Sequence, residues 1–182
     1  MLSFDDIEHL FKERGGEQYS GEPVTQLQHA LQTAALGEAE GASDALVTAA
    51  LLHDLGETPS LRGVDDVHQY RALPFLRGLF PDEVLDAIKL HVDAKRYLCA
   101  ARRGYHSSLS ADSKRSLQLQ GGIFSAEEAA RFIAQPGALD AVKLRLWDDL
   151  AKEENKATPS LAHFLRRARR CALTVSGSAL AL

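Results

Sequence analysis

Residues Ala50–Glu57 read ALLHDLGE, and this stretch decides how the chain is interpreted. A helix composed almost entirely of Leu and Ala is typical of a protein core. This one ends in His53 and Asp54, a pair that is costly to bury unless another group neutralises it. A bound metal ion explains the pair, and so does a polar helix end followed by a surface turn at Gly56. Two residues make a weak motif, so the rest of the sequence has to decide.

Outward from this stretch, apolar residues recur every three or four positions, and no run alternates with period two. This pattern predicts an all-α fold, a single domain over residues 1–182. Capping residues, Gly and Pro predict helices at 3–14, 24–39, 43–56, 66–79 with a bend at Pro74, 81 to at least 91, 113–119, 125–136, 139–152 and 158–173. Residues 58–65 and 104–110 are predicted to be irregular, and residues 174–182 to form a frayed tail.

The composition is that of an ordinary globular protein, with 182 residues, 45% of them hydrophobic and 25% charged, and a net charge of −4. No apolar run reaches the roughly 18 residues of a membrane span, and the acidic N-terminal segment is unlike a signal peptide. The one basic run, Arg166–Arg170, suits the last turns of a terminal helix. We therefore expect neither nucleic acid nor membrane as a partner. Cys99 and Cys171 lie far apart, which indicates free thiols in a reducing cytoplasm. Nothing in the sequence indicates an oligomeric state.

Four histidines lie on four different predicted helices: His29, His53, His68 and His91. One histidine on an apolar helix face is more often a core residue than a ligand, but four of them with Asp54 favour a metal site. Helical bundles build such sites by pointing imidazoles and carboxylates inward from facing helices. Late in the chain, Asp148 or Asp149 can complete the set.

The order His29, His53-Asp54 and a late Asp resembles the HD-domain metallohydrolase superfamily. The segments YSGEPVTQLQHALQ, AALLHDLG, LHVDAKRYLC, SLQLQGG and KLRLWDDLAK together resemble the phosphonate-degrading HD-domain oxygenases more specifically. This similarity extends from Tyr19 to Lys152, and myo-inositol oxygenases are more distant relatives. The resemblance implies an all-α HD-domain helical bundle around a dinuclear metal site.

The resemblance also implies the roles of individual residues. Asp54 would bridge two irons in a mixed-valent Fe(II)/Fe(III) pair. The terminal ligands would be His29, His53, His68, His91 and Asp148. Asp148 is preferred to Asp149 because these oxygenases place a phosphonate-binding arginine three residues before the ligand, and Arg145 occupies that position.

Further matches concern the substrate. Lys95, Ser113, Ser116 and Arg145 match phosphonate-binding residues, with both serines near a helix start that suits an anion. Tyr19 and Glu22 match a pair that covers one iron until substrate displaces it. We expect Lys95 and Arg145 to bind the anion without supporting the fold. Each assignment has an ordinary structural alternative: surface charges for Lys95 and Arg145, helix caps for the serines, and loop packing for Tyr19.

Glu57 departs from the family pattern, in which the HD pair is followed by x-G-H. A carboxylate at this position would repel a phosphonate but can face a cationic group on the substrate. Glu57 is therefore a candidate substrate-binding residue that favours a substrate carrying an amine, and the alternative is a simple surface carboxylate.

The activity implied is that of an oxygenase. Dioxygen, the co-substrate, would cleave the C–P bond of a 1-hydroxyalkylphosphonate and release phosphate and a carboxylate. A metal-dependent phosphohydrolase acting on a nucleotide or another phosphate ester is the alternative, since it uses the same ligand set with a metal-bound water. A binding module with a decayed site is a third interpretation, which the six filled ligand positions oppose.

Overall fold

The computed structural model describes residues 2–19, 21–56 and 67–174, which fold mainly into α-helices. In chain order these are α1 (Phe4–Arg14), α2 (Gln26–Ala39), α3 (Asp44–Leu52), α4 (His68–Arg71), α5 (Leu73–Leu76), α6 (Asp82–Ala101), α7 (Tyr105–Ser108), α8 (Ala111–Leu119), α9 (Ala126–Ile133), α10 (Ala138–Leu150) and α11 (Leu161–Cys171). The all-α prediction is confirmed. The predicted loop at 58–65 and nearly all of the predicted tail lie outside the described residues.

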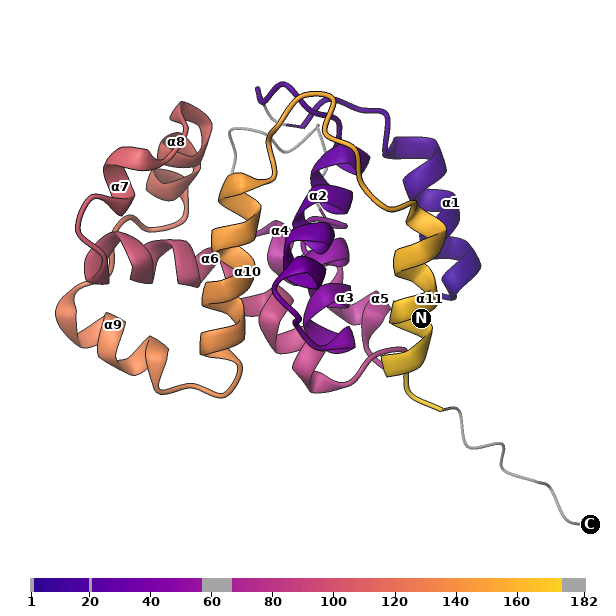
Figure 1. Ribbon diagram of the computed structural model, residues 1–182. Helices are drawn as coiled ribbons and strands as arrows, with labels where there is room; N and C mark the ends of the chain where they lie inside the picture. Colours follow the sequence, from indigo (N-terminus) through magenta and orange to yellow (C-terminus); the bar gives the residue numbers. More distant parts are fainter. Residues whose placement is uncertain (1, 20, 57–66, 175–182) are drawn as a thin grey trace, which may run out of the picture.

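The helices surround a central group of four (Figure 1). α2, α3, α6 and α10 pack against one another in the middle of the molecule, with the most extensive contacts between α6 and α10 and between α2 and α3. α1 and α11 cover one side of this group, and α7, α8 and α9 lie at the other side. The helices predicted to carry histidines are therefore mainly the central ones.

The central group is held together by an apolar core. In α3 every side chain from Leu46 to Leu52 is buried, as its sequence predicts. Gly37 of α2 allows a close approach to α10, because a Cβ at this position would lie 2.9 Å from the ring of Trp147. The ring is itself buried, so a larger residue at position 37 would separate the two helices. This contact lies one residue before Asp148.

Capping residues explain where most helices begin. The side chains of Ser3, Thr25, Ser43 and Ser125 each accept a hydrogen bond from the backbone N–H three residues later. The helix starts predicted near these four residues agree with the structure to within two residues. The helix predicted to begin at 158 begins later, because the hydroxyl of Ser160 caps α11.

Three other predicted boundaries need correction. The predicted helix at 66–79 is two short helices, α4 and α5, which meet at Ala72, with Pro74 in the first turn of α5. The segment 104–110 is not wholly irregular, since burial of Tyr105 and Leu109 in a small apolar cluster accompanies the single turn α7. α8 begins earlier than predicted, and its cap is Ser110.

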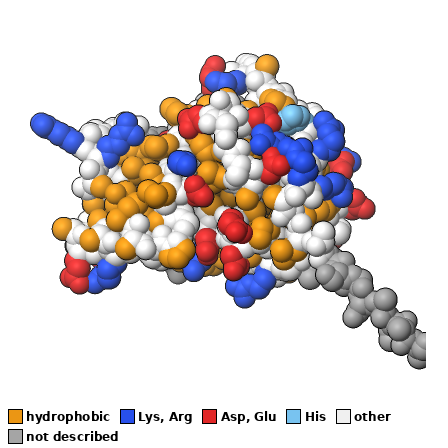
Figure 2. Space-filling view, turned by 60° about the horizontal axis from the view of Figure 1, so that its bottom comes forward, with side chains coloured by type: hydrophobic (Ala, Val, Ile, Leu, Met, Phe, Trp, Pro, Cys, Tyr) orange, Lys and Arg blue, Asp and Glu red, His pale blue; other side chains and the backbone are white. Residues whose placement is uncertain are grey.

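The basic run near the C-terminus pairs with acidic residues of α2 and α3. Arg167 lies 2.6 Å from Asp44 and 2.7 Å from Glu38, and Arg170 lies 2.7 Å from Asp44. Figure 2 shows Lys and Arg side chains interspersed with Asp and Glu over this face of the molecule. The run therefore holds α11 on the fold. Among the described helices, none combines the length and the apolar composition needed to cross a bilayer.

Candidate metal centre

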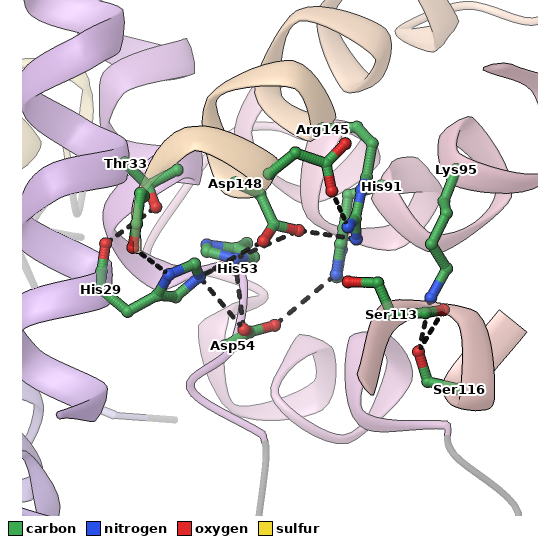
Figure 3. Close-up of polar contacts among 12 residues, drawn as sticks. His29, Thr33, His53, Asp54, His91, Lys95, Ser113, Ser116, Arg145 and Asp148 are labelled. Atoms are coloured by element: carbon green, nitrogen blue, oxygen red, sulfur yellow. Dashed lines mark hydrogen bonds and ion pairs between the residues drawn. The ribbon is translucent and has the colours of Figure 1, made fainter. Parts of the chain in front are cut away.

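Six side chains from distant parts of the sequence meet at the centre of the fold, and Figure 3 labels all of them except His68. They are His29 of α2, His53 and Asp54 after α3, His68 at the start of α4, His91 of α6 and Asp148 of α10. His29, His53, His91 and Asp148 are almost fully buried, while about a tenth of the side chain of Asp54 and of His68 is exposed. The structure thus brings together all six residues of the predicted ligand set.

A glycine positions the His53-Asp54 pair against His68. The turn that follows α3 contains Gly56, whose backbone lies against the start of α4. A Cβ at Gly56 would stand 2.4 Å from the carbonyl oxygen of His68, so no other residue fits without displacing α4. The glycine of ALLHDLGE therefore permits the approach of His68 to Asp54. The predicted helix end at Gly56 is wrong, because α3 already ends at Leu52.

The carboxylate of Asp54 lies between two groups of histidines. Its Oδ2 is 3.2 Å from Nε2 of His53 and 3.6 Å from Nε2 of His29. Its Oδ1 is 3.2 Å from Nε2 of His68 and 3.6 Å from Nε2 of His91. Each oxygen thus faces a different pair of imidazoles, which is the arrangement that a bridging carboxylate requires.

Backbone carbonyls orient three of these imidazoles. Nδ1 of His29 lies 2.9 Å from the oxygen of Ala151, Nδ1 of His53 lies 2.9 Å from that of Ala50, and Nδ1 of His91 lies 2.6 Å from that of Ile88. Since a carbonyl only accepts, each Nδ1 carries the hydrogen and donates it. In the neutral ring, Nε2 is then left with its lone pair, which is the form that binds a metal.

The lone pairs converge. Nε2 of His29 lies 3.3 Å from Nε2 of His53, and Nε2 of His68 lies 3.1 Å from Nε2 of His91. Two lone pairs at this distance repel each other unless a proton or another cation lies between them.

Asp148 presents one oxygen to the first histidine group. Its Oδ1 is buried, lies 3.4 Å from Nε2 of His29, and has no hydrogen-bond partner among the residues that the structure describes. Its Oδ2 forms an ion pair with Nη1 of Arg145, at 2.7 Å. Asp149 instead accepts hydrogen bonds from Tyr105 and Arg145. A buried carboxylate oxygen without a donor is costly, and a metal ion would satisfy it.

The protonation states suit a cation. Burial opposes ionisation of both carboxyls, but His53 holds the pKa of Asp54, and Arg145 that of Asp148, well below its ordinary value. Burial lowers the pKa of His91 to about 3, so this ring is neutral. Burial acts to lower the pKa of His53, but the negative charge of Asp54 opposes burial. The pKa of His53 is on balance raised, which means that Asp54 favours positive charge on this ring.

The donor atoms fit one or more metal ions. The ligand atoms of His29, His53 and Asp148 all lie within 4.8 Å of one another, and so do those of His53, Asp54 and His91. Buried imidazoles with ionised carboxylates are a donor set typical of Fe, Mn or Zn sites. The arrangement can therefore hold metal ions on both sides of Asp54.

A small cavity of about 60 Å³ opens against this centre. Its lining includes six residues that the sequence predicts outside the ligand set: Tyr19, Glu22, Lys95, Ser113, Ser116 and Arg145. The ring of Tyr19 is stacked on that of His29, with centroids 3.9 Å apart and an angle of 10° between the planes. Tyr19 therefore covers a residue of the metal centre, beyond packing its loop against α2.

The predicted anion-binding residues lie on one side of this cavity. Nζ of Lys95 is buried and donates to Oγ of Ser116, at 2.8 Å. Ser113 is also buried, in the first turn of α8, where its N–H is already bonded to Ser110. The cap is thus Ser110, and neither Ser113 nor Ser116 serves as one.

Arg145 differs from the prediction. Its guanidinium is buried and paired with both Asp148 and Asp149, and its Nε lies 3.4 Å from the hydroxyl of Tyr105. The expectation that Arg145 does not support the fold is therefore wrong, since its guanidinium forms ion pairs with two carboxylates of α10. It still lines the cavity, which leaves an anion-binding role as a proposal.

Two other residues of the site were missed. Tyr105 hydrogen-bonds to Asp149 from the segment predicted to be irregular, and no local pattern indicates this contact. Lys152 lines the cavity and lies 2.9 Å from Glu22. Lys152 follows Asp148 by four residues. On the predicted helix 139–152 this spacing would place both side chains on one face, so the sequence could have indicated that Lys152 lies near the site. Glu57, predicted to bind the substrate, lies outside the described residues.

Comparison with known proteins agrees with this geometry. The family model described as HD domain matches residues 27–120. The chain is 38% identical to a [1-hydroxy-2-(trimethylamino)ethyl]phosphonate dioxygenase (glycine-betaine-forming) of Leisingera caerulea, over 85% of this chain and 83% of the relative. It is 38% identical to a hydroxymethylphosphonate dioxygenase of Gimesia maris, over 86% and 82%. An uncharacterized protein of Acanthamoeba polyphaga mimivirus is 32% identical, over 90% and 79%.

Proposed function

The chain belongs to the HD-domain family, and within it to the group that contains phosphonate dioxygenases, and from this membership we propose that it cleaves the C–P bond of a 1-hydroxyalkylphosphonate with dioxygen. The products are inorganic phosphate and a carboxylate. One observation carries the proposal: the carboxylate of Asp54 separates two histidine pairs beside a cavity lined by cations and hydroxyls.

The proposed cofactor is a pair of iron ions in the mixed-valent Fe(II)/Fe(III) state. His29, His53 and Asp148 would hold one iron, His68 and His91 the other, and Asp54 both. When bound, the irons supply the activation of dioxygen. Every other part of the reaction depends on how this chain binds and orients the substrate.

The phosphonate is proposed to bind where Lys95, Ser113 and Ser116 lie together. Lys95 contributes a buried positive charge, and the two hydroxyls donate hydrogen bonds to phosphonate oxygens. Tyr19, stacked on His29, and Glu22, at the edge of the cavity, cover the centre until substrate enters. Covering the centre in this way limits the access of dioxygen and water before the substrate is in place.

The overall reaction balances without a further reductant. A 1-hydroxyalkylphosphonate and one O2 contain the atoms of one carboxylic acid and one phosphoric acid. The substrate supplies all four electrons that reduce O2: its carbon is oxidised to the acid level as the C–P bond breaks. This balance agrees with the absence from the sequence of a Gly-rich dinucleotide-binding turn.

The substituent on the carbon that carries the hydroxyl and the phosphonate defines the substrate class. The printed names of the two relatives differ in this respect, since one substrate carries a trimethylamino group and the other has no substituent. Glu57 favours the amine-bearing class. We place the enzyme in the cytoplasm, which suits its two free cysteines.

The test compares phosphate release in air and under nitrogen. The iron-loaded protein is incubated with hydroxymethylphosphonate, with an amine-bearing 1-hydroxyalkylphosphonate, and with a phosphomonoester. The proposal predicts phosphate from a phosphonate in air only. Phosphate from the phosphomonoester at equal rates in both atmospheres, with none from either phosphonate, would support a phosphohydrolase instead.

A further inference from the structure

Lys152 occupies a fixed position beside the cavity, because its backbone neighbours are both held by α2. The carbonyl of Ala151 accepts a hydrogen bond from His29, at 2.9 Å. Glu153 exchanges two hydrogen bonds with the side chain of Gln32, at 2.8 and 3.1 Å. The side chain of Lys152 thus starts from an ordered backbone, and only 14% of it is exposed.

The ammonium group of Lys152 lies between a carboxylate and two hydroxyls. Its Nζ is 2.9 Å from Oε1 of Glu22, 3.3 Å from Oγ of Ser113 and 3.5 Å from Oγ of Ser110. Ser113 is one of the residues proposed to bind the phosphonate. A phosphonate oxygen bonded to Ser113 is therefore within reach of Lys152.

Lys152 places a second lysine charge, beside that of Lys95, at the cavity where a phosphonate would bind. A phosphonate dianion brings two negative charges. Arg145 is already paired with Asp148 and Asp149, so its charge is offset before the anion arrives. Lys152 is likewise paired with Glu22, but Glu22 belongs to the segment that covers the centre. Displacement of Glu22 by substrate would leave Lys152 with a buried charge to be satisfied.

We propose that Lys152 is a further substrate-binding residue, which exchanges the carboxylate of Glu22 for a phosphonate oxygen when the substrate binds. This inference rests on the proposed function, and it names a residue and a step beyond it. Lys152 also lines a second, wider cavity of about 590 Å³, together with Ser110 and Arg102.

A different role would have a different signature. If Lys152 only clamps the segment that contains Tyr19 and Glu22, then removing either partner of the ion pair releases the segment. Both substitutions would then change phosphonate affinity in the same direction. If Lys152 exchanges partners, Glu22 competes with the anion, so the two substitutions act in opposite directions.

The experiment measures binding of methylphosphonate, which lacks the 1-hydroxyl, to the iron-loaded protein under nitrogen by calorimetry. Lys152→Met should raise the Kd about tenfold or more, as expected for loss of a charge-assisted contact. Glu22→Gln should lower the Kd, and the double variant should behave like Lys152→Met. Lys156→Met is the matched control, because Lys156 forms an exposed ion pair with Glu153 at 2.6 Å. It should leave the Kd unchanged.

The outcomes separate this inference from the proposed function. Wild-type protein that binds methylphosphonate, with an unchanged Kd in Lys152→Met or a weaker one in Glu22→Gln, would overturn the inference alone. Wild-type protein that binds no methylphosphonate would overturn the anion site on which the proposed function rests, and the inference with it. If Lys152→Met does not fold, judged by its melting temperature, the sign of the Glu22→Gln effect decides.

Discussion

The Nη1 of Arg145 lies 2.7 Å from the Oδ2 of Asp148, one helical turn further along α10, and both side chains are buried. This ion pair fixes the carboxylate so that its other oxygen faces His29, at 3.4 Å. The arginine therefore orients a residue of the metal centre. Burial opposes ionisation of Asp148, but the charge of Arg145 holds the pKa of this carboxyl well below its ordinary value.

Replacing Arg145 should destabilise the metal-free protein. Arg145→Ala leaves Asp148 and Asp149 without their cation, and breaking a buried pair in this way costs about 3–5 kcal/mol. We expect the melting temperature to fall by about 6 °C or more, measured by calorimetry. Lys143→Ala is the control on the same helix, since the pair between Lys143 and Asp140 is exposed. Equal melting temperatures for the two variants would contradict the structural role of Arg145.

The protein should bind two metal ions, and single substitutions should remove them selectively. His68 lies on the Oδ1 side of Asp54, so His68→Ala should lose one ion of the two. Asp54 faces both histidine groups, so Asp54→Ala should lose both. Elemental analysis of protein made in iron-rich medium measures the content. His9→Ala is the control, because the side chain of His9 is exposed on α1. Full occupancy in His68→Ala would show that the centre is not dinuclear.

The ion pairs of α11 should make stability depend on pH. Arg170, and then Arg167, hold the pKa of Asp44 below its ordinary value of 3.8, while burial opposes them. A carboxyl whose pKa is lower in the folded state than in the unfolded state stabilises the folded protein at pH values above the unfolded-state pKa. This stabilisation is lost as the pH falls through the folded-state pKa. Asp44→Asn should therefore cost about 1 kcal/mol at pH 7, and progressively less below pH 3.8.

Thermal melts of wild type and Asp44→Asn across this pH range measure the difference. Asp140→Asn is the matched control, because Asp140 also lies in the first turn of a helix but pairs with Lys143 at the surface. A difference between wild type and Asp44→Asn that stays constant from pH 7 to below 3.8 would contradict the assignment.

Much of the fold and the centre could be predicted because the signals are local. The apolar helix before His53 and the capping serines are each visible within a few residues. The choice of Asp148 over Asp149 came from the resemblance to the phosphonate-degrading oxygenases, which implies an arginine three residues before the ligand, as Arg145 is here. In the structure Asp148 is the one that faces His29, while Asp149 faces Tyr105.

The rest depended on contacts between distant segments. The pair between Lys152 and Glu22 spans 130 residues, and the contact between Tyr105 and Asp149 spans 44. Neither contact follows from periodicity. Both form only when α10 and the residues after it pack beside the segment before α2 and beside α7. The same packing explains why Arg145, expected to face only an anion, is occupied by carboxylates of its own helix.

Glu57 should influence which substrate is preferred. A carboxylate beside the site attracts an ammonium group and repels a second anion. Glu57→His should therefore lower kcat/KM for an amine-bearing 1-hydroxyalkylphosphonate relative to hydroxymethylphosphonate. Steady-state kinetics on both substrates measure the ratio, with Glu127→His as a control for an exposed carboxylate that does not line the cavity. An unchanged ratio would mean that Glu57 does not contact the substituent.

The molar ratio of dioxygen consumed to phosphate released tests the central claim most directly. An oxygen electrode and a phosphate assay follow the same reaction of iron-loaded protein with its best phosphonate substrate, without added reductant. Because the substrate supplies all four electrons, the account predicts a ratio of one at every time point, and no phosphate once oxygen is exhausted. Phosphate that continues to accumulate after the oxygen is gone would contradict it.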